Sequence, residues 1–178
     1  CLPKEDFPII ETNTGGNKIK AKAEVLYKLI DKTKFAISNE ETRYFLNGLY
    51  CNITKEENNS FITFVGTDGH RLAKFSCPNN DISADIPGVI IPKKTINELS
   101  KLLSENTSQI ELDITANKIV FYIDKLILIS KLIDGNFPDY KKVIPNNNTN
   151  NLIVNRLNLL SAVDRVSTIA NEKSPVIK

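Results

Sequence analysis

The amino-acid sequence predicts an α+β fold in which two helices are backed by mostly antiparallel sheets. Segments rich in aromatic and β-branched residues are separated by short polar turns, and two longer segments carry apolar residues at helical spacing. The order of strand, helix and further strands also occurs twice along the chain, which indicates a duplicated unit. The apolar helix faces are therefore expected to pack on the strands, with the polar faces exposed.

The first repeat begins with an alternating stretch, KIKA at 18–21, which predicts a strand. A helix is predicted next, over AEVLYKLIDKTKFAI at 23–37, because apolar residues recur there at helical spacing. Three strands are then expected in YFLNGLYCNI at 44–53, SFITFVGT at 60–67 and RLAKFS at 71–76. The Asn47-Gly48 pair lies inside the first of these strands and is interpreted as a bulge or turn.

The second repeat has the same order of elements. GVII at 88–91 predicts a strand, and PKKTINELSKLLSE at 92–105 predicts a helix that ends near Asn106. Strands are expected in QIELDI at 109–114, KIVFYI at 118–123 and LILISKL at 126–132. The short turns at Ala116-Asn117 and Asp124-Lys125 favour hairpins over crossover helices.

A third repeat begins near the end of the chain, with LIV at 152–154 and an apolar helical pattern at 155–169. The leading residues Ile19, Ile90 and Leu152 lie 71 and 62 residues apart. We therefore expect a linker at 1–17, one complete domain at 18–145, and a linker with the truncated start of another domain at 146–178. The absence of methionine also favours a piece of a longer polypeptide.

Composition excludes several classes of protein. The 23 Lys and Arg residues nearly balance the 21 Asp and Glu residues, so any basic surface must arise from arrangement. The longest apolar runs are far shorter than the roughly 20 residues that a membrane span needs, and no signal-peptide pattern opens the chain. Cys1, Cys51 and Cys77 show no CxxC spacing and His70 is the lone histidine. No metal, disulfide framework or cofactor is predicted, a reducing cytoplasm is expected, and Cys51 and Cys77 are interpreted as buried small hydrophobes.

The polar faces of the predicted helices each carry a modest basic excess. The basic residues are Lys22, Lys28, Lys32 and Lys34 on the first helix, Lys93, Lys94 and Lys101 on the second, and Arg156 and Arg165 on the third. The same helices also carry acidic residues, which are fewer: Glu24, Asp31, Glu98, Glu105 and Asp164. Two interpretations stay open on this pattern alone: ordinary solvated helices, or a surface that binds nucleic acid.

Three local strings carry a resemblance to a known family: ETRYFLNG at 41–48, VGTDGHRLAK at 65–74 and SKLIDGNFPDYKKVIP at 130–145. In this order and spacing, the chain resembles the bacterial DNA polymerase III beta subunit, the sliding clamp, from about Leu2 to Lys178. The resemblance implies the DNA clamp fold and a ring of two head-to-tail protomers that encloses double-stranded DNA without reading its sequence. Such a ring is a processivity factor in DNA replication, and it tethers the polymerase without catalysing a reaction.

The resemblance also implies two sets of binding residues. Contacts to DNA would come from Lys20, Lys28, Lys32, Arg43, Tyr44, Phe45, Lys93, Lys94 and Lys101. A hydrophobic pocket for short peptides of the polymerase alpha subunit, the clamp loader and repair proteins would include Leu46, Thr67, Gly69, His70, Arg71, Leu72, Pro138, Lys142 and Val143. Lys142 stands where some family members carry Arg, and a lysine there would weaken a bidentate or stacked contact.

A small hydrolase that uses Asp68 and His70 is the alternative from another class of protein, since histidine is the commonest general base. No second ligand pair lies near them, and no GxSxG, HExxH or GxxxxGK spacing occurs. Thr67 to Gly69 are interpreted as a tight turn between two strands, which is compatible with lining a pocket. Phe137, Tyr140 and, less strongly, Pro138 have an alternative interpretation as anchors of a strand end to the core.

Overall fold

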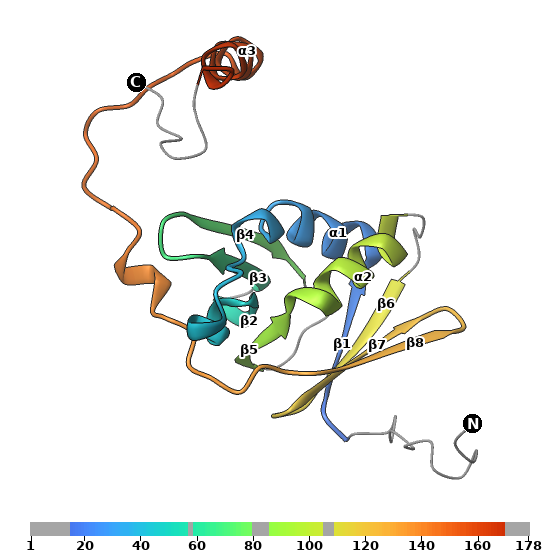
Figure 1. Ribbon diagram of the computed structural model, residues 1–178. Helices are drawn as coiled ribbons and strands as arrows, with labels where there is room; N and C mark the ends of the chain where they lie inside the picture. The colour runs from blue at the N-terminus through green and yellow to red at the C-terminus, as the bar shows by residue number, and fades with distance from the viewer. Residues whose placement is uncertain (1–14, 57–58, 80–85, 105–108, 170–178) are drawn as a thin grey trace. The chain divides into compact units, whose positions relative to one another are not determined.

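The computed structural model describes residues 15–56, 59–79, 86–104 and 109–169 (Figure 1). The chain divides into two compact units, residues 1–138 and 139–178, and each is treated by itself. Among the described residues, no helix is long and apolar enough to cross a membrane.

The described residues of the first unit form two antiparallel sheets of four strands each. The first sheet has the order β1 (Asn17–Lys22), β6 (Gln109–Ile114), β7 (Lys118–Ile123) and β8 (Leu126–Lys131). The second has the order β4 (Leu72–Pro78), β3 (Asn59–Thr67), β2 (Gly48–Glu56) and β5 (Ile86–Pro92). This architecture confirms the predicted α+β class and the predicted antiparallel hairpins.

The two repeats exchange their first strands. β1 belongs to the first repeat but pairs with β6 of the second, and β5 belongs to the second repeat but pairs with β2 of the first. The outer edges of both exchanged strands are also held: the Asn79 side-chain amide donates to the Lys20 carbonyl at 2.8 Å, and the Ile133 amide donates to the Ile90 carbonyl at 3.0 Å. Each of these donors follows the last strand of its own repeat, so the two sheets are joined at corresponding places.

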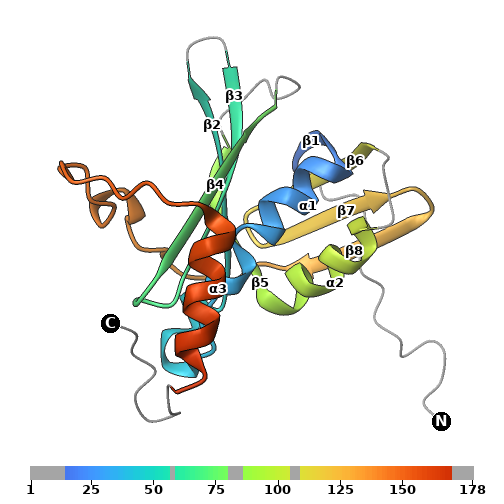
Figure 2. The ribbon, with the colours of Figure 1, turned by 90° about the horizontal axis from the view of Figure 1, so that it is seen from above.

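Helices α1 (Ala23–Asp31) and α2 (Lys93–Ser104) directly follow the exchanged strands and pack against each other (Figures 1 and 2). Their apolar faces are buried in one core with residues of both sheets; its helical members include Leu26, Leu29, Ile96 and Leu99. Cys51 is buried in this core, which confirms its interpretation as a small hydrophobe, and burial raises the pKa of its thiol to about 12. Cys77 is half-buried against the core.

The predicted strand at 44–53 begins too early. Glu41–Leu46 forms a 3-10 helix, η3, and β2 starts only at Gly48. Gly48 pairs with Pro92, the last residue of β5, and the next amide, that of Lys93, donates to the Asn47 carbonyl at 3.0 Å. Because β5 ends and α2 begins at this point, β2 has no partner in β5 before Gly48. The backbone groups of Glu41–Leu46 instead form local hydrogen bonds in a 3-10 helix.

The first helix ends earlier than predicted, at Asp31. The hydroxyl of buried Thr33 donates to the Leu29 carbonyl at 2.6 Å, and a 3-10 turn, η2 (Lys34–Ala36), follows. β-Branched residues that bond to the preceding turn are typical of positions where a helix is interrupted.

In the second unit, η4 (Tyr140–Lys142) is a single 3-10 turn and α3 (Arg156–Ser167) is the predicted helix. The Asn155 side chain caps α3 by accepting hydrogen bonds from the amides of Leu157 at 3.0 Å and Asn158 at 3.2 Å. The preceding LIV at 152–154 does not form the expected strand, because the described residues of the second unit contain no strand with which it could pair.

The core makes a direct prediction about stability. Leu99 is fully buried in α2, whereas Asn97 of the same helix is exposed. Leu99→Ala should lower the free energy of unfolding by about 2–5 kcal/mol, because it would leave a cavity in the core at a fully buried position. Urea unfolding followed by circular dichroism measures this loss. Asn97→Ala is the matched control and should change stability by about 0.5 kcal/mol or less; equal losses for both variants would contradict the packing described here.

Candidate functional site

The 3-10 helix η3 is the meeting point of the three strings singled out in the sequence. A Cβ atom added at Gly69 would lie 2.5 Å from Nη1 of Arg43, so the turn between β3 and β4 lies directly against η3. A Cβ atom added at Gly135 would lie 3.0 Å from Cβ of Phe45 and 3.4 Å from a ring carbon of Tyr44. Segments that are distant in the sequence therefore contact one short helix from two sides.

Phe137 anchors the Gly135 segment to the same region. Its ring stacks on Tyr50 of β2, with centroids 4.8 Å apart and planes 12° from parallel. The Tyr50 hydroxyl in turn lies over Gly88 of β5, where a Cβ atom would be only 1.9 Å from it. This packing confirms the interpretation of Phe137 as an anchor, and it leaves the next residue, Pro138, exposed.

The turn at 67–72 is held by its own hydrogen bonds, which confirms the predicted tight turn. Thr67 pairs with Leu72 across β3 and β4, and the Thr67 hydroxyl donates to the Arg71 carbonyl at 2.7 Å. Oδ1 of Asp68 accepts from the amides of His70 at 2.9 Å and Arg71 at 3.0 Å. Gly69 has a φ of +89°, a conformation that favours glycine.

Asp68 is poorly suited to act as a general base because its carboxylate already accepts hydrogen bonds within its own turn. The backbone amides of His70 and Arg71, joined by the Arg71 guanidinium at 3.0 Å, hold the pKa of its carboxyl at about 2. The carboxylate is therefore ionised near neutral pH and is occupied by its own turn. Within the described residues, no group of three or more His, Cys, Asp and Glu side chains could hold a metal ion. The hydrolase alternative finds no support in this geometry.

Arg43 makes a bidentate ion pair. Its Nε and Nη2 atoms donate to the two carboxylate oxygens of Glu40 at 2.8 and 2.6 Å, and this contact lowers the pKa of Glu40. The side-chain amide of Asn47 fixes the Glu40 backbone by donating to the Glu40 carbonyl at 3.0 Å. Of the neighbouring residues predicted to contact DNA, Tyr44 is 53% exposed and Phe45 is half-buried, with their rings edge to face.

The residues predicted to form a peptide pocket differ in exposure. His70 and Arg71 are exposed and Leu72 is half-buried, but Leu46 is only 3% exposed, so little of its side chain can reach a peptide. Lys142 and Val143 belong to the second unit, where both are exposed.

Phe35 is a residue that the sequence reasoning missed. It is 58% exposed, and the Arg71 guanidinium lies 5.9 Å from its ring centroid. Its exposure could have been predicted from the sequence, because Phe35 does not fall on the apolar stripe formed by Leu26, Leu29 and Ile30. The helix predicted over 23–37 included Phe35 without regard to its position off that stripe. Phe35 adds apolar surface beside the turn at 67–72.

The helix pair presents the predicted basic residues unevenly. Lys28, Lys32, Lys94 and Lys101 are exposed on α1 and α2 or at their ends, whereas Lys93 is half-buried and donates to the Asn39 side chain. Lys20 lies on β1 between Ile19 and Ala21, which point into the core. Because side chains alternate along a strand, Lys20 is on the sheet face opposite the helices and is not brought together with the helix lysines.

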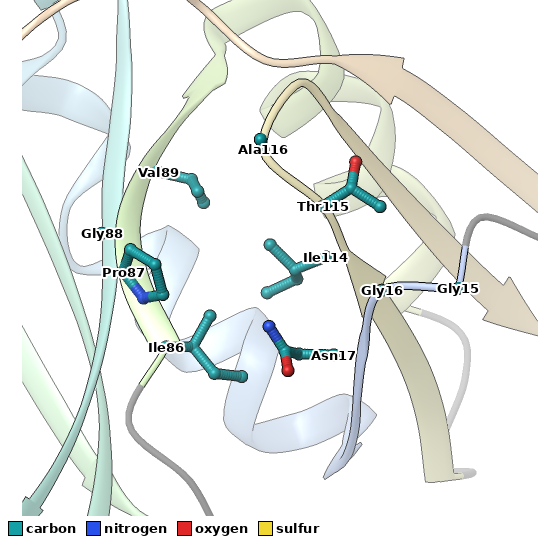
Figure 3. Close-up of a pocket in the computed structure, with 10 residues that line it drawn as sticks. All are labelled: Gly15, Gly16, Asn17, Ile86, Pro87, Gly88, Val89, Ile114, Thr115 and Ala116. Atoms are coloured by element: carbon teal, nitrogen blue, oxygen red, sulfur yellow. The ribbon is translucent and has the colours of Figure 1, made fainter.

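A separate cavity of about 580 Å³ lies where β1, β5 and the β6–β7 turn approach one another (Figure 3). Asn17, Ile86, Val89 and Ile114 are among the residues that line it, with the backbone of Gly15 and Gly16. None of the residues predicted to bind DNA or a peptide lines this cavity.

Comparison with known proteins identifies the family. The model of the central domain of the DNA polymerase III beta subunit matches residues 20–139. The beta sliding clamp of Caulobacter vibrioides is 43% identical over 177 residues, which cover 99% of this chain and 48% of that protein. The beta sliding clamp of Rickettsia bellii is 35% identical over 181 residues, covering 99% of this chain and 46% of that protein.

Solved structures agree in fold. The sliding clamp from Bartonella birtlesii, bound to griselimycin, superposes with a TM-score of 0.88 at 45% identity and covers 97% of this chain and 46% of that chain. A Caulobacter crescentus clamp gives a TM-score of 0.90 at 43% identity, covering 96% of this chain and 46% of that chain. The chain thus spans about half the length of the relatives it matches. Because the central-domain model matches residues 20–139 and a beta sliding clamp is 43% identical over 177 aligned residues, the chain belongs to the family of DNA polymerase III beta subunits, the beta sliding clamps.

Proposed function

We propose that this chain is part of a sliding clamp, a processivity factor that encircles duplex DNA and tethers the replicative polymerase without catalysing a reaction. The observation that carries the proposal is the convergence of three segments on η3, which places the turn at 67–72 and the segment at 135–137 against one short helix. The acid of this turn is fixed in backbone hydrogen bonds, and the exposed residues of the turn are suited to contact a partner.

The DNA-facing role is assigned to the exposed faces of α1 and α2. A clamp that slides should hold phosphates through diffuse lysine contacts, since directional bonds to bases would stop it. Lys28, Lys32, Lys94 and Lys101 fit this role because they are exposed on one helix pair. Arg43 is committed to Glu40, so η3 would meet DNA chiefly through exposed Tyr44.

The peptide-binding role is assigned to the surface around the turn at 67–72. Leu72 and Pro138 offer apolar surface to a Leu or Phe anchor, and Thr67, His70 and Arg71 supply polar groups that orient a peptide. The family resemblance also assigns a peptide-binding role to Lys142 and Val143, which are exposed in the second unit. The griselimycin-bound clamp from Bartonella birtlesii supports a ligand site in this family.

The proposed partners are double-stranded DNA, the polymerase alpha subunit, the clamp loader and other proteins with a clamp-binding peptide. Residues 18–145 would be the complete middle domain, between a linker at 1–17 and the start of another domain at 146–178. The full-length protein would act in the cytoplasm as a head-to-tail homodimer.

Peptide binding tests the proposal directly. A fluorescent peptide with Leu and Phe anchors should bind saturably, and Leu72→Asp and Val143→Asp should each weaken binding by about tenfold or more, because an ionised carboxylate replaces apolar contact surface. Fluorescence anisotropy measures the affinity. Leu126→Asp is the matched control, since Leu126 is a partly exposed leucine on β8, away from η3. Equal loss in the control, or no binding to the folded wild-type chain, would refute the assignment.

The turn at 67–72 has a predicted pH dependence. Folding lowers the pKa of Asp68 to about 2 from its ordinary value of 3.8, so the ionised form stabilises the folded state. This stabilisation is fully present above about pH 5 and is lost as pH falls from about 4 to 2. The difference in urea midpoint between the wild type and Asp68→Asn should therefore be constant from neutral pH to about 5 and close below it. A carboxyl midpoint near 4 in an NMR titration of Asp68 would contradict the hydrogen bonding described.

A further inference from the structure

Each of the two helices that carry the proposed DNA-facing lysines also carries an acidic side chain on the same exposed face. In α1, Nζ of Lys28 contacts Oε1 of Glu24 at 2.5 Å, one helical turn away. In α2, Nζ of Lys101 contacts Oε1 of Glu98 at 3.0 Å. All four side chains are more than half exposed, so these pairs face solvent and are not part of the core.

The two pairs lie where duplex DNA would approach. On α1, Leu26, Leu29 and Ile30 are buried, and Glu24 and Lys28 project from the opposite side. On α2, Ile96, Leu99 and Leu103 are buried, and Lys94, Glu98 and Lys101 project from the opposite side. Since α1 and α2 pack together, their exposed sides form one surface.

A carboxylate on this surface opposes phosphate binding in two ways. It repels phosphates within the screening distance, which is about 8 Å at physiological salt. The carboxylate also holds a lysine in an ion pair, and that lysine must leave the pair before it can neutralise a phosphate. The contact with Glu24 raises the pKa of Lys28 and lowers the pKa of Glu24. Both groups are therefore charged at neutral pH, and Glu24 repels phosphates there as a full negative charge.

Lys94 gives the contrast within the same surface. It is exposed on α2, and among the described side chains no carboxylate lies within ion-pair distance of it. Lys94 is therefore ready to meet a phosphate, whereas Lys28 and Lys101 must first exchange partners.

We infer that Glu24 and Glu98 act as electrostatic brakes that weaken the grip of the α1 and α2 surface on duplex DNA, keeping contacts diffuse enough for sliding. This inference rests on the proposed DNA-facing role of the helix pair and adds a function for its acidic residues. A purely structural role is the competing explanation, because a glutamate that precedes a lysine by one turn stabilises a helix slightly.

The test compares Glu24→Gln, Glu98→Gln and the double variant with the wild-type chain. Fluorescence anisotropy with a labelled duplex of mixed sequence, at a series of KCl concentrations, gives the affinity and its salt dependence. Each single variant should bind DNA several-fold more tightly at low salt. The slope of log affinity against log salt should become steeper by up to about one unit for each lysine released.

Glu111→Gln is the matched control. Glu111, which is half-buried, also makes an ion pair with an exposed lysine, Lys18 at 3.0 Å, but from β6 and β1 on the sheet face away from the helices. This variant should leave DNA affinity unchanged. An equal gain in Glu111→Gln would show a nonspecific effect of net charge and would overturn the inference.

Lys94→Gln separates the inference from the proposed function. If Lys94→Gln weakens DNA binding and the glutamate variants do not strengthen it, the DNA surface stands and the brake is refuted. If the wild type and every variant fail to bind duplex at the lowest salt, the DNA surface itself is refuted and the inference with it. A change in melting temperature for Glu24→Gln and Glu98→Gln with no change in affinity would assign both residues to helix stability alone.

Discussion

The exchange of β1 and β5 between the two sheets is the constraint on which the rest of the structure depends. Each exchanged strand continues directly into a helix, so pairing β1 with β6 and β5 with β2 places α1 and α2 side by side over both sheets. The apolar faces of α1 and α2 then fill one core. Their charged faces lie on the opposite sides of the helices and therefore point toward solvent. The pairing of β1 with β6 and of β5 with β2 therefore brings lysines of both repeats together on one helix surface.

The same exchange determines where the second surface forms. β5 ends at Pro92 because α2 begins at Lys93, and β2 therefore has no partner before Gly48. The preceding residues fold into η3, and the turn at 67–72 and the segment at 135–137 pack against it. The two candidate surfaces are thus both consequences of the places where the exchanged strands turn into helices, although they differ in chemistry.

Local patterns predicted the helices, the hairpin turns and the repeat, because each depends on residues close together in the sequence. They could not predict the strand exchange, since β1 and β6 pair across about ninety residues and either sheet would satisfy the same alternation. They also missed η3, whose conformation depends on where β5 ends. The outward position of Lys20 could have been predicted, because Ile19 and Ala21 beside it are both apolar. Leu46 was assigned to the pocket by resemblance, but its burial depends on tertiary packing.

The two proposed surfaces would hold their partners by different physical interactions, and this difference would suit the proposed role of a protein that moves along DNA and stays attached to a partner. The helix surface uses exposed charges, which salt screens and which exchange partners readily. The surface around the turn at 67–72 is preorganised: Asp68 fixes its backbone, Arg43 packs against Gly69, and apolar Leu72 and Phe35 need no counterion. Contacts of the first kind would cost little to break at each step along DNA. Contacts of the second kind would not depend on that movement, so under the proposed function a partner would remain bound while the DNA passes.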